Sequence, residues 1–76
     1  MEVDQQELGK AREALSLSLT RLAGHSGYAR PSWSQVLNGK LWPEQATLEK
    51  IAQRMELDVD YLAIAIAEKR IEKRKE

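Results

Sequence analysis

This chain contains no cysteine and no phenylalanine, and it has one histidine among its 76 residues. Without thiols it cannot form disulfides or thiolate metal sites, so we expect a reducing compartment. One histidine and no cysteine also leave no ligand set for zinc and no pairing of a nucleophile with a base. We therefore expect no metal, no cofactor and no enzymatic activity.

Long apolar runs are missing as well. No run approaches the roughly 18 residues that a membrane-spanning helix needs, and the first residues, MEVDQQEL, are acidic rather than signal-like. A core with few aromatic residues must be built from Leu, Ile, Val and Ala, which suits a helical bundle better than a sheet. These features predict a cytoplasmic, single-domain all-α protein over residues 1–76 that has no membrane partner.

Charge is balanced over the chain but unevenly distributed along it. The formal net charge is zero, yet residues 14–43 hold Arg21, Arg30 and Lys40 and none of the twelve acidic residues. A positive, acid-free segment is what a surface facing DNA phosphates needs. The alternative interpretation is a chance gap in the acidic residues across an apolar segment.

The segment over residues 18–43 predicts two short helices joined by a tight turn. Leu22 and Ala23 form an apolar face on the first helix, Gly27 supplies the bend, and Trp33 lies on the apolar face of the second. A short turn that contains glycine is typical of a helix-turn-helix unit, whose second helix enters the DNA major groove. We place this unit at about 18–38.

Helix signals in the rest of the chain complete a compact five-helix domain. Arg30 occupies a position like an N-cap because the residue before a proline avoids helical geometry. Asp4, Ser18 and Asp58 are expected to cap the first, second and fifth helices, and Pro43 is expected to open the fourth. The helices are expected at about 4–15, 18–26, 30–38, 43–55 and 59–75.

Several short motifs follow one another in a distinctive order. They are Leu22-Ala23, Gly27, Trp33, Asn38-Gly39-Lys40, Pro43, Thr47-Leu48, Ile51-Ala52 and the run LDVDYL over residues 57–62. This order resembles the λ-repressor-like (Xre/Cro) family over about residues 8–62. Gly27-Tyr28-Ala29 and the later Trp42-Pro43 also resemble the Ner-like phage regulators of that superfamily. The resemblance implies a λ-repressor-like fold and a sequence-specific transcriptional regulator of double-stranded DNA, expected to act as a repressor.

Three positions depart from the pattern that the resemblance implies. Leu19 stands where the family usually has a glutamine that contacts DNA, and Ala29 stands where a serine or threonine usually caps the recognition helix. Trp33 replaces a small aliphatic residue, and we interpret it as a core residue rather than a stacking platform for bases. These departures leave the fold prediction in place, and they fall within the helix-turn-helix unit itself.

Most of the residues predicted to contact DNA lie on the helix expected at 30–38, on the face opposite Trp33. Gln35 is the best candidate base reader because a side-chain amide can pair bidentately with adenine, and Arg30 can bind guanine or phosphate. Lys40, in the following loop, is expected to hold phosphate without reading sequence. A phosphate contact is also expected from the first turn of the preceding helix, so the full predicted set is Ser18, Thr20, Ala29, Arg30, Pro31, Ser32, Ser34, Gln35, Asn38 and Lys40.

The fifth helix carries a second apolar stripe. We expect Tyr61, Ile64 and Ile71 to lie opposite the buried face, where nothing in a minimal domain would cover them, and to form a homodimer interface. Trp42 is expected to pack beneath the second helix of the unit, with contact to the DNA backbone or to a partner as the alternatives. The charged run at the end of the chain is expected to be a solvated helix end rather than a tail that contacts DNA.

Two other functions stay open at this point. The chain could be an antitoxin-type autoregulator, in which the same fold binds DNA and masks a protein partner. It could also be a helix-turn-helix fold used only for protein–protein association.

Overall fold

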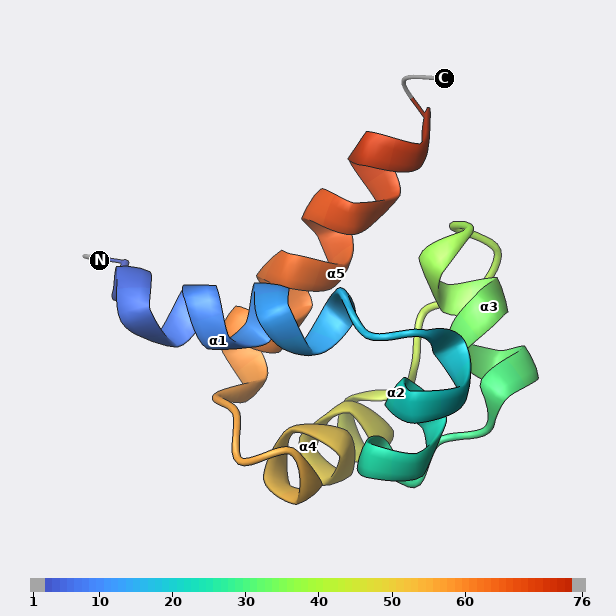
Figure 1. Ribbon diagram of the computed structural model, residues 1–76, viewed down its shortest axis with the longest axis horizontal. Helices are drawn as coiled ribbons and strands as arrows, with labels where there is room; N and C mark the ends of the chain where they lie inside the picture. Colours follow the sequence, from blue (N-terminus) through green and yellow to red (C-terminus); the bar gives the residue numbers. More distant parts are fainter. Residues whose placement is uncertain (1–2, 75–76) are drawn as a thin grey trace.

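The computed structural model describes the backbone of residues 3–74 and the side chains through Ile71, and it confirms an all-α fold. Figure 1 shows α1 and the long α5 crossing on one side, with α2 and α3 on the other and α4 beneath them. The helices are α1 (Gln5–Leu15), α2 (Leu19–Ser26), α3 (Arg30–Leu37), α4 (Gln45–Arg54) and α5 (Val59–Arg74). The part of the fifth helix expected at residue 75 lies outside the described residues.

The predicted caps of the first two helices are confirmed. The carboxylate of Asp4 accepts hydrogen bonds from the backbone N–H groups of Gln6 and Glu7, at 3.0 and 3.3 Å. Ser18 Oγ accepts the N–H of Arg21 at the start of α2, and Gly27 ends that helix in the left-handed conformation at φ 73°. Because glycine adopts this conformation without steric cost, the chain can turn sharply into α3.

The third helix starts at Arg30 as predicted, but one predicted N-cap and one predicted helix start are wrong. Ala29 is the N-cap of α3 with extended geometry, so Arg30 is already the first helical residue. This start is compatible with Pro31 because the first turn of a helix leaves its N–H groups without intrahelical acceptors. In α4 the N-cap is Glu44, which is extended, and Pro43 is buried in the loop before it instead of opening the helix.

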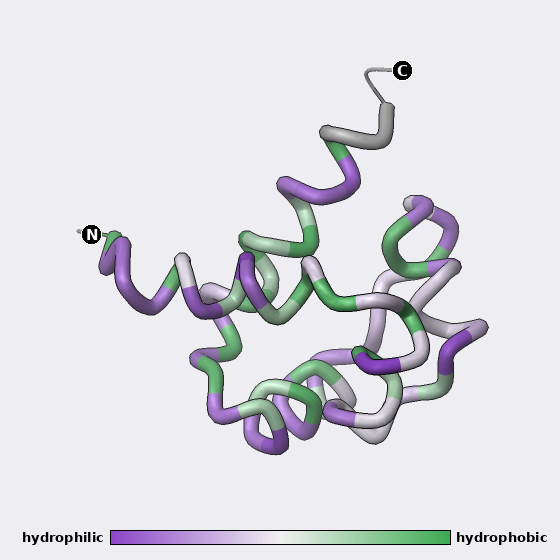
Figure 2. The backbone as a smooth tube through the Cα atoms, in the orientation of Figure 1, coloured by the Kyte–Doolittle hydropathy of each residue, from purple (hydrophilic) through white to green (hydrophobic). Residues whose placement is uncertain are grey.

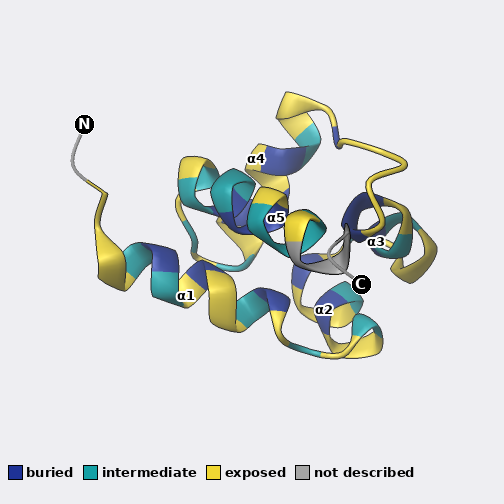
Figure 3. Cartoon of the chain, turned by 90° about the horizontal axis from the view of Figure 1, so that it is seen from above, coloured by how far each residue is buried: buried dark blue, intermediate teal, exposed yellow. Residues whose placement is uncertain are grey.

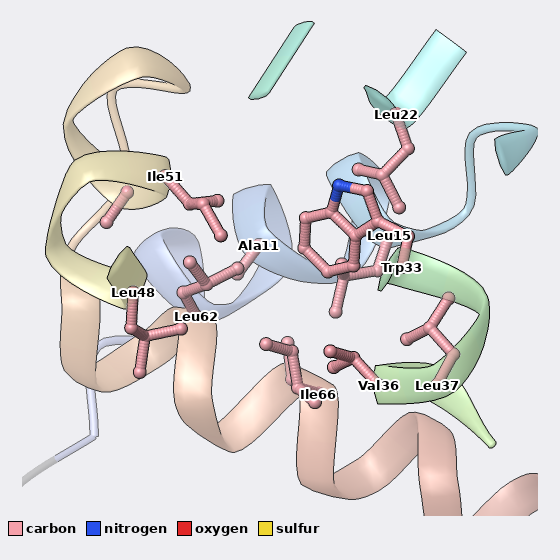
Figure 4. Close-up of a cluster of buried hydrophobic side chains, with 12 residues drawn as sticks. Ala11, Leu15, Leu22, Trp33, Val36, Leu37, Leu48, Ile51, Leu62 and Ile66 are labelled. Atoms are coloured by element: carbon pink, nitrogen blue, oxygen red, sulfur yellow. The ribbon is translucent and has the colours of Figure 1, made fainter. Parts of the chain in front are cut away.

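One hydrophobic core joins the five helices. Figure 4 shows Trp33 and Val36 of α3 together with Leu22 of α2 and with Leu62 and Ile66 of α5. All five of these side chains have no solvent exposure. Burying an aliphatic side chain of this kind contributes roughly 1.5–3 kcal/mol. Because Leu62 and Ile66 belong to this cluster, α5 packs directly against the helix-turn-helix unit and stabilises it. Figure 2 shows hydrophobic and hydrophilic positions interspersed along the helices, as expected when each buries one face.

The expectation that the second stripe of α5 stays uncovered is wrong for its first part. The hydroxyl of Tyr61 accepts the N–H of Asp4 at 2.7 Å, so α1 lies over this side chain. Ile64 is half-buried, and among these predicted interface residues Ile71 is the most exposed, at 58%. The missed cover arises because α1 packs more extensively on α5 than any other helix does.

An ion pair joins the same two helices further along. Arg12 donates from Nε and Nη2 to the two carboxylate oxygens of Glu68, both at 2.8 Å. These hydrogen bonds hold the pKa of Glu68 below its usual value. The pair therefore stabilises the fold above the ordinary glutamate pKa, and this contribution is lost as the pH falls through the lowered pKa. Because both side chains are exposed, the contribution is small.

Candidate nucleic-acid interface

Ser26 is the hydrogen-bonding centre of the helix-turn-helix unit, and sequence reasoning did not single it out. Its hydroxyl donates to the carbonyl of Leu22 at 2.7 Å and accepts the indole N–H of Trp33 at 2.8 Å. It also accepts the backbone N–H of Tyr28 at 3.2 Å. One buried hydroxyl therefore ties the end of α2, the turn and the middle of α3 together. The available signal was a serine seven positions before a tryptophan, beside the turn glycine.

The aromatic side chains of the turn and of α3 reinforce this junction. The ring of Tyr28 meets that of Trp33 edge to face, with centroids 5.5 Å apart and planes at 89°. Such a geometry is favourable for aromatic pairs. The prediction that Trp33 is a core residue is confirmed, since its side chain has no exposure.

Fixing the inner side of α3 determines which side chains face solvent. Figure 3 shows the buried positions of α3 turned toward the other helices and the exposed ones on its outer side. Exposed positions among the predicted contacts are Ser18, Thr20, Ala29, Arg30, Pro31, Gln35, Asn38 and Lys40, and Ser32 and Ser34 are half-buried. The predicted contacts on α3 therefore share one accessible surface.

The N-terminal end of α3 is open. No side chain caps it, because Ala29 has no hydrogen-bonding group at the N-cap position. The first-turn N–H groups of Arg30 and Ser32 can therefore point to an external acceptor, and the positive end of the helix dipole favours an anion there. At the start of α2, Leu19 packs partly against the core, so it does not replace the glutamine that the resemblance implies.

The C-terminal end of α3 is closed by the predicted Asn38-Gly39 stop. Gly39 is left-handed at φ 79°, and its N–H donates to the carbonyl of Val36 at 3.2 Å. The N–H of Lys40 donates to the carbonyl of Gln35 at 2.9 Å, which completes a Schellman motif. This turn fixes the backbone of Lys40 immediately beside the exposed face of α3.

The structure separates Trp42 from the core. Its side chain is 44% exposed, so the prediction that it packs beneath α3 is wrong. The ring instead lies against the guanidinium of Arg70 from α5, with Cζ 4.9 Å from the ring centroid. A contact between residues so distant in sequence is beyond what the local pattern of the chain can indicate.

The fold and this surface define a helix-turn-helix protein. A family model described as a helix-turn-helix domain matches residues 6–63, which span α1 to α4 and the start of α5. The chain belongs to this family, which indicates a DNA-binding regulator. No curated protein and no solved structure matches the chain. Within residues 3–74, no helix is long and apolar enough to cross a membrane.

Replacing Ser26 with alanine is expected to lower the free energy of unfolding by about 1–3 kcal/mol, because the buried indole N–H of Trp33 loses its acceptor. The measurement is urea unfolding followed by tryptophan fluorescence. Ser16→Ala is the matched control, since Ser16 also donates to a carbonyl of its own helix end but is exposed. We expect the control to change stability by at most about 0.5 kcal/mol. Equal effects of the two substitutions would contradict the role given to Ser26.

Proposed function

We propose that this protein is a sequence-specific regulator of transcription that binds double-stranded DNA by inserting α3 into the major groove. The observation that carries this proposal is the orientation of α3. Its inner face is fixed by Ser26 and Trp33, while Arg30 and Gln35 face solvent on its other side. The acid-free segment over residues 14–43 supplies a surface that does not repel phosphate.

Each exposed residue has a defined task in this proposal. Gln35 reads a base edge, with adenine as the best geometric match, and Arg30 binds guanine or a nearby phosphate. Lys40 and the start of α2 around Ser18 and Thr20 hold the phosphate backbone and set the register of α3 on the duplex. The chain has no cysteine and one histidine, and the proposal assigns it no catalytic activity.

The finer assignment within helix-turn-helix proteins is also part of the proposal. The five-helix order, with α2 and α3 forming the unit, supports a λ-repressor-like (Xre/Cro) regulator. The Gly27-Tyr28-Ala29 and Trp42-Pro43 motifs support a relation to the Ner-like phage regulators. In this role the protein acts as a repressor, since α3 in an operator excludes other proteins from the same groove. A DNA partner places the protein in the compartment that holds the genome.

The test is an amide chemical-shift titration of labelled protein with a duplex from the region upstream of its own gene. The proposal predicts shifts at residues 18–21 and 30–40, and small changes in the middle of α4. The control is a scrambled duplex of the same length, which should give smaller shifts at α3. Shifts confined to α1 or α4, or no shifts at low salt, would contradict the proposal.

We further propose that the protein acts as a homodimer, because two copies can read two half-sites about one helical turn of DNA apart. Since α1 covers Tyr61 and Ile64 is half-buried, the proposed interface centres on Ile71 near the end of α5. Sedimentation equilibrium is expected to show a dimer at micromolar concentration that Ile71→Glu weakens by at least about tenfold. Val3→Glu, at another exposed apolar residue, is the control. A native monomer at several hundred micromolar would contradict dimerisation.

A second function is favoured by the exposed apolar side chains of Leu41, Trp42 and Ile71. Such side chains can contact a protein partner, as in an antitoxin-type autoregulator or a fold kept for protein association alone. The chemical-shift titration separates a fold used for association alone from both DNA-binding functions. A fold used for association alone leaves the α3 amides unchanged by DNA, whereas an autoregulator shows the same DNA-dependent shifts as a repressor.

A further inference from the structure

One arginine of α5 binds both the last turn of α3 and the loop that follows it. Arg70 donates from Nε to the carbonyl of Val36 at 2.7 Å and from Nη2 to the carbonyl of Leu41. The face of its guanidinium lies against the ring of Trp42, with Cζ 4.9 Å from the centroid. A single side chain therefore adds hydrogen bonds from α5 to the last turn of α3 and to the loop after it, beside the core packing of Val36.

The segment spanned by these contacts contains Lys40. The two accepting carbonyls belong to residues 36 and 41, and the Schellman turn of Asn38, Gly39 and Lys40 lies between them. Lys40 is exposed, so its side chain is free to meet a phosphate beside the end of α3. Because the segment over residues 36–41 is held at both ends, it loses less conformational freedom when it binds than an unconstrained segment does.

The geometry requires an arginine. A guanidinium offers several N–H donors in a fixed plane and a face that stacks on an aromatic ring, whereas an ammonium is a point charge. Lysine at this position can reach one carbonyl, but it cannot span both and keep the planar stack on Trp42. The contact is thus more specific than attraction of a positive charge to the end of a helix.

The part of α5 that carries Arg70 is held by the core. Ile66 lies one helical turn before Arg70 and has no solvent exposure, so the core fixes this part of α5. Arg70 also lies beyond residue 63, where the match to the helix-turn-helix family ends. The match to the family therefore does not include this contact.

We propose that Arg70 is a positioning residue for DNA binding, which holds the end of α3 and the following loop so that Lys40 meets a phosphate. This inference rests on the proposed function. Direct binding of a phosphate by Arg70 is a different role and is an outcome of the test. Its guanidinium is already committed to two carbonyls and a ring, which favours the positioning role.

The first experiment compares DNA affinity and its salt dependence for the native protein, Arg70→Lys and Arg70→Gln. We expect both variants to weaken binding by about tenfold, since each releases the segment that holds Lys40, and binding must then restrict its conformational freedom. We also expect the salt slope to fall by about one, as for a lost phosphate contact. The control is Lys69→Gln, a half-buried cation beside Arg70, which should stay within about twofold of native. Native affinity in Arg70→Lys with loss in Arg70→Gln would indicate direct phosphate binding and overturn the positioning role.

The second experiment needs no DNA. Amide hydrogen exchange is expected to become about tenfold faster at Gly39 and Lys40 in Arg70→Lys, while exchange in α1 and α2 stays at the native rate. Unchanged exchange at Gly39 and Lys40 would overturn the inference. Absence of DNA binding by the native protein would overturn the proposed function together with this inference. Native binding that both Arg70 variants retain would overturn this inference alone.

Discussion

Replacing Trp33 with alanine is expected to leave little folded protein at 37 °C. Trp33 has no solvent exposure and fills the centre of the core between α2, α3 and α5. Removing so large a buried side chain costs about 3–5 kcal/mol, which approaches the whole stability of a small domain. The substitution also leaves the hydroxyl of Ser26 without the indole N–H that it accepts. Thermal unfolding followed by circular dichroism measures the loss.

The second tryptophan provides the matched control for this prediction. Trp42 is 44% exposed and contacts Arg70 outside the core. We expect Trp42→Ala to cost at most about 1 kcal/mol, since an exposed cation–π contact contributes about 0.5–1 kcal/mol. A Trp33→Ala protein that melts within a few degrees of native would contradict the central place given to this residue.

Replacing Gln35 with alanine is expected to reduce binding to the preferred duplex by about 5- to 150-fold. This range corresponds to the 1–3 kcal/mol or so that a bidentate contact between a side chain and a base supplies. Affinity for a scrambled duplex should change little, because the phosphate contacts remain. Stability should also be unaffected, since Gln35 is exposed. Fluorescence anisotropy with both duplexes measures the two affinities.

Two further variants define what this result means. Gln53→Ala removes an exposed glutamine from α4 and should leave both affinities at the native value. Arg30→Ala should weaken binding to both duplexes if Arg30 holds a phosphate, and to the preferred duplex alone if it reads a guanine. Preferred and scrambled duplexes bound equally by native protein and by Gln35→Ala would mean that α3 does not read sequence.

The parts of the fold that sequence reasoning predicted depend on neighbouring residues. Asp4, Ser18 and Gly27 act through hydrogen bonds or backbone geometry within three or four positions, so their roles are visible in the printed sequence. The buried spacing of Trp33 and Val36 likewise follows from the helical period, which also determined the outward face of α3.

Helix starts were harder to predict because weak local preferences compete. The residue before a proline avoids helical geometry, which favoured Arg30 as the N-cap. The N-cap is instead Ala29, which makes no side-chain cap, and Arg30 is helical because Pro31 is tolerated within the first turn. Pro43 was expected to open the fourth helix because proline is favoured at the first helical position, but it is buried in the preceding loop.

Contacts between distant segments could not be predicted from the sequence. Ser26 was visible as a helix end, but its bond to the indole of Trp33 depends on how α2 meets α3. The hydrogen bond between Asp4 and Tyr61 joins residues that are 57 positions apart in the sequence. The bond between Arg70 and Val36 joins residues that are 34 positions apart. The helical period does not encode such contacts. The sequence therefore predicted which residues of the candidate site are exposed, but not the residues that position α3, which are Ser26 and Arg70.

A salt series of fluorescence-anisotropy titrations tests the central claim most directly. It compares a duplex from upstream of the protein's own gene with a scrambled duplex of the same length and composition. Our account predicts tighter binding to the native duplex and, for both, a logarithm of affinity that falls linearly with the logarithm of salt concentration. Equal affinity for the two duplexes, or no binding even at low salt, would contradict the claim that α3 reads DNA sequence.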